Sequence, residues 1–188
     1  MQKTHTDREY EQQLRSLREM LLLMAGRVEQ MISDSIKALV NADVDLARRT
    51  IEADHKINRA ELGADELCLL ILAKRQPMAS DLRFITLALK MVTDLERIGD
   101  LCVNISERVM ALGASPSPSV AERLTRLSDV GQKMIRDSID AFVASDVTKA
   151  RSVFSRDQFV DDAYRELAME MQQEMIRDRD FVNRGIHL

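Results

Sequence analysis

Carboxylates occupy positions in two amphipathic stretches where apolar side chains are expected. Followed in steps of three or four residues, the seam over residues 44–72 is apolar at both ends but carries Asp54 and further acids in its middle. The seam over residues 82–103 carries Glu96, and Asp100 follows one helical turn later on the same side. A core-facing carboxylate is costly unless it is hydrogen-bonded, paired or bound to a metal. Carboxylates from two helices of one bundle can therefore converge on a hard or borderline cation.

The same acids have a second interpretation. The helices can twist so that the acids lie at the wet edge of the seam, where Arg97, Lys90 or Arg108 would pair with them. Asp157 and Asp161 stand at the corresponding places of a later stretch and are open to the same two interpretations. Spacing alone does not decide between a cation site and a solvated acidic edge, because acidic pairs four residues apart are common by chance.

The composition predicts that these acids are positioned by helices. Aromatic residues make up 4% of the 188 residues, and there are only 6 Gly and 3 Pro, which is unfavourable for a β-rich fold. A long apolar seam predicts a first helix that ends near residue 41, and Asp43 is expected to cap a second helix that runs to about Arg75. Pro77 interrupts the pattern, and Ser80 or Asp81 is expected to cap a third helix that ends near residue 112.

The chain repeats itself. Residues 31–54 and 134–157 align without a gap, and 12 of the 24 positions are identical. We therefore expect an all-α protein of tandem pseudo-symmetric three-helix bundles, with a first bundle over residues 1–112, a linker over 113–119 and a second bundle over 120–188. The second unit turns at residues 145–146, and its second helix ends near residue 177. Its third helix would span about 183–215 by analogy with the first unit, so the second bundle is expected to be incomplete or completed by association.

Other features narrow the class of protein. The 27 Lys and Arg residues are interspersed with 31 Asp and Glu, and there is no aromatic platform for bases, so nucleic acid is not an expected partner. The longest apolar run, residues 67–73, is too short to span a bilayer, and no secretory signal is visible. Cys68 and Cys102 lie in apolar stretches, as expected of buried thiols in a reducing compartment, so a cytoplasmic location is expected.

Two segments together resemble the signature segments of the PhoU family of bacterial phosphate-signalling accessory proteins. They are KRQPMASDLR at residues 74–83 and DLERIGD at residues 94–100, and residues 28–31 and 43–54 agree with the family too. The resemblance implies a cytoplasmic regulator rather than an enzyme. It also implies an adaptor between the Pst phosphate transporter ATPase and a sensor histidine kinase, which keeps the phosphate-starvation response off when phosphate is plentiful. The protein is expected to be a homodimer.

The resemblance also bears on the acidic residues. Some PhoU-like proteins bind iron or zinc through a Glu/Asp-x-x-x-Asp motif on the third helix of each bundle, which corresponds to Glu96 and Asp100, with Asp94 as a neighbour. The second copy of that motif would fall near residues 199–203, past the end of this sequence. A bundle whose role is the bound ion is the alternative to the adaptor. The candidate metal ligands are thus Glu96, Asp100, Asp94, Asp54, Asp157 and Asp161.

Overall fold

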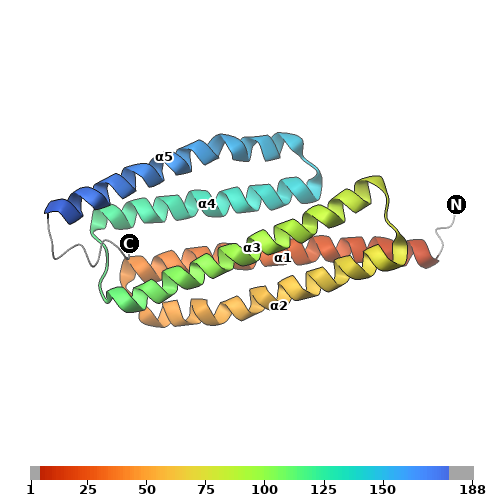
Figure 1. The fold of residues 1–188 in the computed structure, drawn as a ribbon, viewed down its shortest axis with the longest axis horizontal. Coiled ribbons are helices and arrows are strands. Elements are labelled where there is room, and N and C mark those ends of the chain that lie inside the picture. The colour runs from red at the N-terminus through yellow and green to blue at the C-terminus, as the bar shows by residue number, and fades with distance from the viewer. Residues whose placement is uncertain (1–4, 178–188) are drawn as a thin grey trace.

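The computed structural model describes residues 5–177, with side chains from residue 8 onward, and within this range it is all-helical (Figure 1). The described residues form five helices joined by short turns. They are α1 (His5–Asn41), α2 (Val44–Arg75), α3 (Ala79–Leu112), α4 (Pro118–Ala144) and α5 (Val147–Arg177). The prediction of an all-α protein is confirmed, and none of these helices is long and apolar enough to cross a membrane.

The turns lie where the sequence places them. Asp43 has an extended backbone, and its carboxylate accepts a hydrogen bond of 2.9 Å from the backbone N–H of Leu46, so it is the N-cap of α2 as predicted. Helix α2 ends at Arg75, where Gln76 adopts the left-handed conformation ahead of Pro77. The turn between α4 and α5 centres on Ser145, which is also left-handed, and the carboxylate of Asp146 accepts from the backbone N–H of Lys149.

The start of α3 differs from the expectation. Its N-cap is Met78, which has no capping side chain, so neither Ser80 nor Asp81 caps the helix. Asp81 instead accepts a hydrogen bond of 2.8 Å from the phenol of Tyr10, which ties the beginning of α1 to the beginning of α3. Partial burial and this hydrogen bond raise the pKa of Tyr10 to about 12. The carboxylate of Asp81, which local spacing predicted as a cap of α3, therefore accepts a long-range hydrogen bond instead.

The linker between the two units is shorter than expected at its C-terminal end. Ser117 caps α4 by accepting from the backbone N–H of Val120, and Pro118 occupies the first turn, where its missing N–H costs nothing. Helix α4 therefore begins at Pro118 rather than near Val120. Residues 113–117 remain outside the helices.

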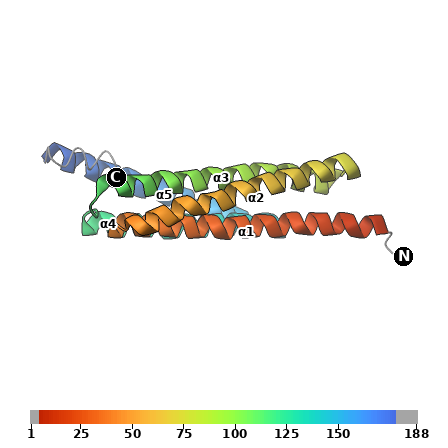
Figure 2. The same ribbon diagram turned by 90° about the horizontal axis from the view of Figure 1, so that it is seen from below.

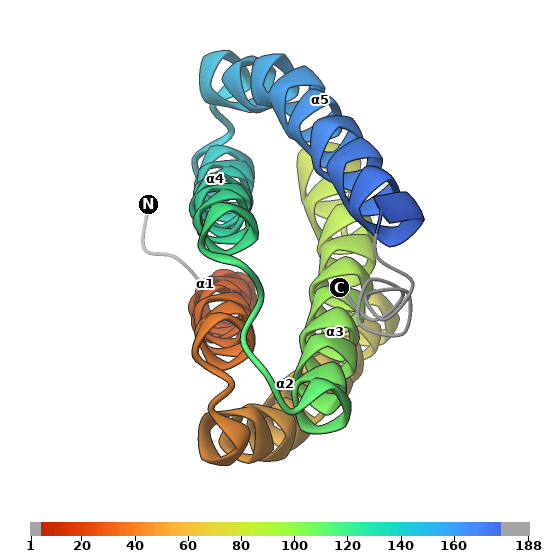
Figure 3. The same ribbon diagram turned by 90° about the vertical axis from the view of Figure 1, so that its left-hand side faces the viewer.

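Helices α1, α2 and α3 form a bundle with a continuous apolar core. Viewed end-on, α2 lies on one side of α1, α4 lies on the other, and α3 packs beside α1 and α2 (Figure 3). The seam of α1 that the sequence indicated is fully enclosed: Leu17, Leu21 and Val28 are each 0% exposed. Cys68 and Cys102 are buried in the same core as free thiols, and burial raises the pKa of each to about 11.

Helices α4 and α5 form a second layer that packs on the first bundle through α1. In Figure 1, α4 runs antiparallel to α1, and α5 folds back along α4. Figure 2 shows that all five helices follow one long axis, so the described protein is an elongated stack. The tandem helical architecture agrees with the prediction. The third helix expected for the second unit, at 183–215, lies outside the described residues.

Candidate functional site

The acids that the sequence singled out meet on one side of the first bundle. We call this surface the acidic face and define it as Asp54, Asn58, Glu61 and Asp65 of α2 with Glu96 and Asp100 of α3. Helices α2 and α3 pack against each other along their length, which places the acids of one helix beside those of the other. The predicted convergence of acids from two helices therefore occurs in the first unit.

Asp54 is the deepest member of the acidic face. The residue is 8% exposed, and its Oδ2 accepts a hydrogen bond of 2.8 Å from the side-chain amide of Asn58. Its other oxygen, Oδ1, is buried and has no hydrogen-bond partner. The amide oxygen of Asn58 is also buried and also has no hydrogen-bond partner. Gly99 of α3 lies directly opposite, because a Cβ built on it would come within 3.1 Å of Asp54 Oδ1. A buried oxygen of this kind ordinarily accepts a hydrogen bond from a protein group or a water molecule, or contacts a cation.

Like charges dominate the electrostatics of the acidic face. Burial raises the pKa of Glu96, and the neighbouring charges of Asp100, Glu61 and Asp54 raise it further against a small opposing effect of Arg97. Burial, Asp65 and Asp100 likewise raise the pKa of Glu61. The cations of the wet-edge interpretation form no ion pair with these acids: among residues 8–177, no salt bridge involves Lys90, Arg97 or Arg108.

The acidic face offers oxygen ligands to a metal but not a closed ligand set. Across the described chain, no three His, Cys, Asp or Glu side chains lie close enough together to hold a metal ion. Oxygen donors suit hard cations, whereas iron and zinc sites in proteins usually include His or Cys. The buried and unpartnered oxygens of Asp54 and Asn58 favour an ion. The iron or zinc centre therefore stays a prediction.

The remaining candidate ligands lie elsewhere. Asp94 is exposed on the opposite side of α3, where it borders a shallow apolar pocket between α3, α4 and Val153 of α5. Asp157 is exposed on α5, and Asp161 forms an exposed ion pair of 3.6 Å with Arg165. The structure thus brings Glu96, Asp100 and Asp54 together but not the other three.

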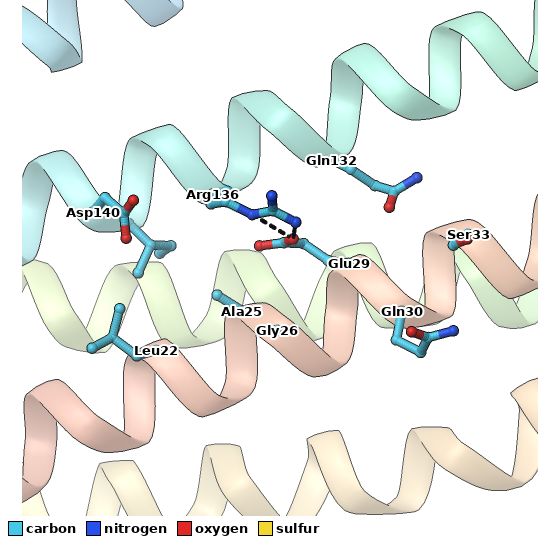
Figure 4. Close-up of a pocket in the computed structure, with 10 residues that line it drawn as sticks. Leu22, Ala25, Gly26, Glu29, Gln30, Ser33, Gln132, Arg136 and Asp140 are labelled. Carbon is cyan, nitrogen blue, oxygen red and sulfur yellow. Dashed lines mark hydrogen bonds and ion pairs between the residues drawn. The ribbon is translucent and has the colours of Figure 1, made fainter.

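The structure adds a polar site between the two units that the sequence analysis did not identify. A pocket of about 450 Å³ opens between α1 and α4, and Figure 4 shows Glu29 and Arg136 pointing toward each other across it. The guanidinium of Arg136 donates through Nε to Glu29 Oε2 at 2.9 Å, and its terminal nitrogen binds the same oxygen. The sequence held little signal for this pair, because Arg136 in place of Ser33 is one of the 12 of 24 aligned positions at which the two units differ.

An aromatic stack joins the two units six residues farther along α4. The rings of Phe84 on α3 and Phe142 on α4 stack with their centroids 5.0 Å apart, and the guanidinium of Arg18 lies 4.6 Å above Phe84. Together with the Glu29–Arg136 pair, this stack fixes α4 against the first bundle at two separate points.

Comparison with known proteins gives a consistent result. Residues 21–109 and 124–186 match the PhoU domain family. The phosphate-specific transport system accessory protein PhoU of Edwardsiella tarda is 35% identical over 174 residues, which cover 93% of this chain and 72% of that protein. The PhoU homolog of Pseudomonas putida is 39% identical over 183 residues, covering 96% of this chain and 71% of that protein. The crystal structure of PhoU from Pseudomonas aeruginosa superposes with a TM-score of 0.89 at 37% identity, covering 95% of this chain and 86% of that one.

Proposed function

Because the chain belongs to the PhoU family, we propose that it is a regulatory accessory protein of a phosphate transport system and not an enzyme. The observation that carries this proposal is the similarity over nearly the whole chain to proteins named for that accessory role. The regulatory direction we propose is negative: in cells with ample phosphate, the protein keeps phosphate uptake and the starvation response off.

The mode of action that we propose is that of a cytoplasmic adaptor. Its partners are the ATPase of the Pst phosphate transporter and the sensor histidine kinase of the starvation response. An elongated stack of helices with charged and apolar side chains on its surface suits an adaptor, because it offers separate faces to separate proteins. Phosphate status reaches such a protein through the partners, provided that their conformations differ in affinity for it.

The test is a phosphatase reporter of the starvation response, measured in phosphate-rich medium after deletion of the gene. Loss of repression, restored by the wild-type gene on a plasmid, is the expected result. An unchanged reporter would remove the regulatory proposal. A pull-down from phosphate-replete cells then asks whether the transporter ATPase and the kinase are both recovered.

We also propose that the protein forms a homodimer. Helix α5 leaves large apolar side chains uncovered by the described residues, among them Phe154 at 80% and Ile176 at 82% exposed. Light scattering of the purified protein tests this, and a strictly monomeric, cooperatively folding chain would contradict it.

An ion-binding bundle is the second candidate function, and the unpartnered Oδ1 of Asp54 favours it. The candidate ligands around it are Glu96 and Asp100, and the ion would neutralise their charge. Elemental analysis of protein purified without chelators tests this function. Iron, zinc, manganese or nickel at background level, in the wild type as in Glu96→Gln/Asp100→Asn, would eliminate it.

A further inference from the structure

Exposed leucines alternate with the polar residues of the acidic face along α2. Asn58, Leu62, Asp65 and Leu69 follow one another at steps of four, three and four residues, so they form a single stripe on the helix surface. Leu62 and Leu69 are each 62% exposed. Single exposed leucines are ordinary, but a stripe in which they flank carboxylates presents both apolar surface and negative charge to one ligand.

The carboxylates of this face are left without cations, in contrast to Asp137 and Asp140 on α4. On α4, Asp137 binds both Arg156 and Lys149, and Lys149 also binds Asp140 at 2.8 Å. No salt bridge within residues 8–177 involves any carboxylate of the acidic face. Beneath them, Asp54 is more than nine-tenths buried, and its Oδ1, aimed at Gly99 between the helices, accepts no hydrogen bond.

Two kinds of ligand can supply the missing positive charge. A bare metal ion needs several ligands around one point, and no such group of three exists among the described side chains. Cationic side chains need no common centre, because each can pair with a separate carboxylate along the face. A metal would also leave Leu62 and Leu69 exposed, whereas a helix with its own apolar residues would cover them.

We propose that the acidic face, together with Leu62 and Leu69, is the docking surface for a basic amphipathic helix of a partner protein. Lys or Arg side chains on that helix pair with Glu61, Asp65 and the acids of α3, and its apolar residues cover the two leucines. This inference rests on the proposed adaptor function, to which it adds the chemistry of one partner segment.

The test uses a fluorescein-labelled synthetic peptide of eighteen residues, built from Leu and Lys so that it forms an amphipathic helix. Its binding to the full chain is followed by fluorescence anisotropy in buffer containing EDTA. A peptide with Glu in place of Lys and a Leu/Lys peptide of scrambled order are the peptide controls. We expect binding of the ordered Leu/Lys peptide, at least tenfold tighter than binding of either control.

Protein variants locate the binding surface. Glu61→Gln/Asp65→Asn and Leu62→Ser/Leu69→Ser are each expected to weaken binding roughly tenfold, since they remove the charges or the apolar surface separately. The matched control is Glu122→Gln/Asp129→Asn on α4, which removes the same charge from exposed positions outside this face and should change binding less than twofold. Circular dichroism of every variant checks that the helices are retained.

Three results would overturn the proposal. The chain could bind the ordered basic peptide no more tightly than the control peptides, or the control variant could weaken peptide binding as much as the acidic-face variants do. Peptide binding that is absent in EDTA and restored by Mn²⁺ or Zn²⁺ would assign the face to a metal. The reporter experiment distinguishes the two levels of inference. A normal reporter response without peptide binding defeats the docking surface alone, whereas peptide binding with an unchanged reporter after deletion defeats the proposed function alone.

Discussion

The two halves of the repeat carry closely related sequences but bury them differently. Met31 of α1 is 3% exposed and Ser35 is 0% exposed, whereas their equivalents on α4, Met134 and Ser138, are half-buried. In the first unit α3 covers these positions, and within the described residues α4 and α5 have no such covering helix of their own. An amphipathic pattern therefore specifies which side of a helix is suited to a core, but the third helix determines whether that side is enclosed.

The charges of the two halves differ in the same way. Asp54 is buried with an unpartnered oxygen, and its equivalent Asp157 is exposed. Near the α4–α5 turn, Asp137 is paired with cations, which lower its pKa below the ordinary range. The acidic face of the first unit thus gathers acids that repel one another, whereas Asp137 of the second unit is stabilised by its cations.

Truncating the two equivalent methionines gives the largest expected difference. Met31→Ala should lower the free energy of unfolding by about 2–5 kcal/mol, because it opens a cavity in an enclosed core. Met134→Ala removes the same atoms from a half-buried site and should cost less than half as much. Urea denaturation measures both, and equal losses would mean that the two cores are equally well packed.

Removing an acid from the second unit should destabilise the protein. Asp137→Asn breaks charged hydrogen bonds to Arg156 and Lys149, with an expected loss of roughly 1–3 kcal/mol at pH 7. Because the folded-state pKa of Asp137 is lowered, its contribution is present above the ordinary value of 3.8 and is lost as the pH falls through the folded-state value. The melting temperatures of the variant and the wild type should therefore converge at acidic pH. A difference in melting temperature that does not depend on pH would show that the Asp137 charge is not the source of the stability.

Two glycines test the space around the helices. Gly131→Ala on α4 should stabilise the protein by about 1 kcal/mol, since no atom lies within 4 Å of the added Cβ and alanine is the better helix former. Gly99→Ala should give no such gain, because its Cβ meets Asp54 Oδ1 at 3.1 Å and the hydrogen bond to Asn58 holds that carboxylate in place. Calorimetric melting temperatures decide the matter. A gain in melting temperature for Gly99→Ala equal to that for Gly131→Ala would show that the Asp54 carboxylate can move aside without a loss of stability.

Removing an acid from the first unit should have the smallest effect and the opposite sign. Glu96→Gln eliminates repulsion with Asp100 at the i, i+4 position, which is worth about 0.2–0.5 kcal/mol of added stability at pH 7. Asp157→Asn, on the exposed side of α5, serves as the control and should be neutral. A loss of stability in Glu96→Gln would mean that Glu96 has a stabilising partner.

Most of the fold was predictable because it depends on local chemistry. The cap at Asp43, the turn at residues 145–146, the break at Pro77 and the apolar seam of α1 each follow from a few neighbouring residues. The start of α3 was not predictable in this way, since Tyr10, 71 residues away along the chain, binds the carboxylate of Asp81. Local patterns determine helices, but distant contacts decide which polar groups remain for capping.

The candidate site was predictable in part. Core-facing spacing on two helices was enough to place Asp54 beside Glu96, because α2 and α3 pack along their length. The exposure of Asp157 depends on what covers α5, which the spacing does not encode. The Glu29–Arg136 pair was missed because it joins the two units across the α1–α4 junction, and Arg136 is one of many positions at which the two units differ.

The two enclosed thiols make the chain ready for site-specific labelling. Cys68 is 0% and Cys102 is 1% exposed, and a pKa of about 11 leaves almost no thiolate at neutral pH in either side chain. Maleimide dyes react with the thiolate, so a cysteine introduced on the surface would be modified while the native pair stays untouched. A donor on α2 and an acceptor on α5 would then report the distance between the two units in the wild-type background, without first replacing any buried residue.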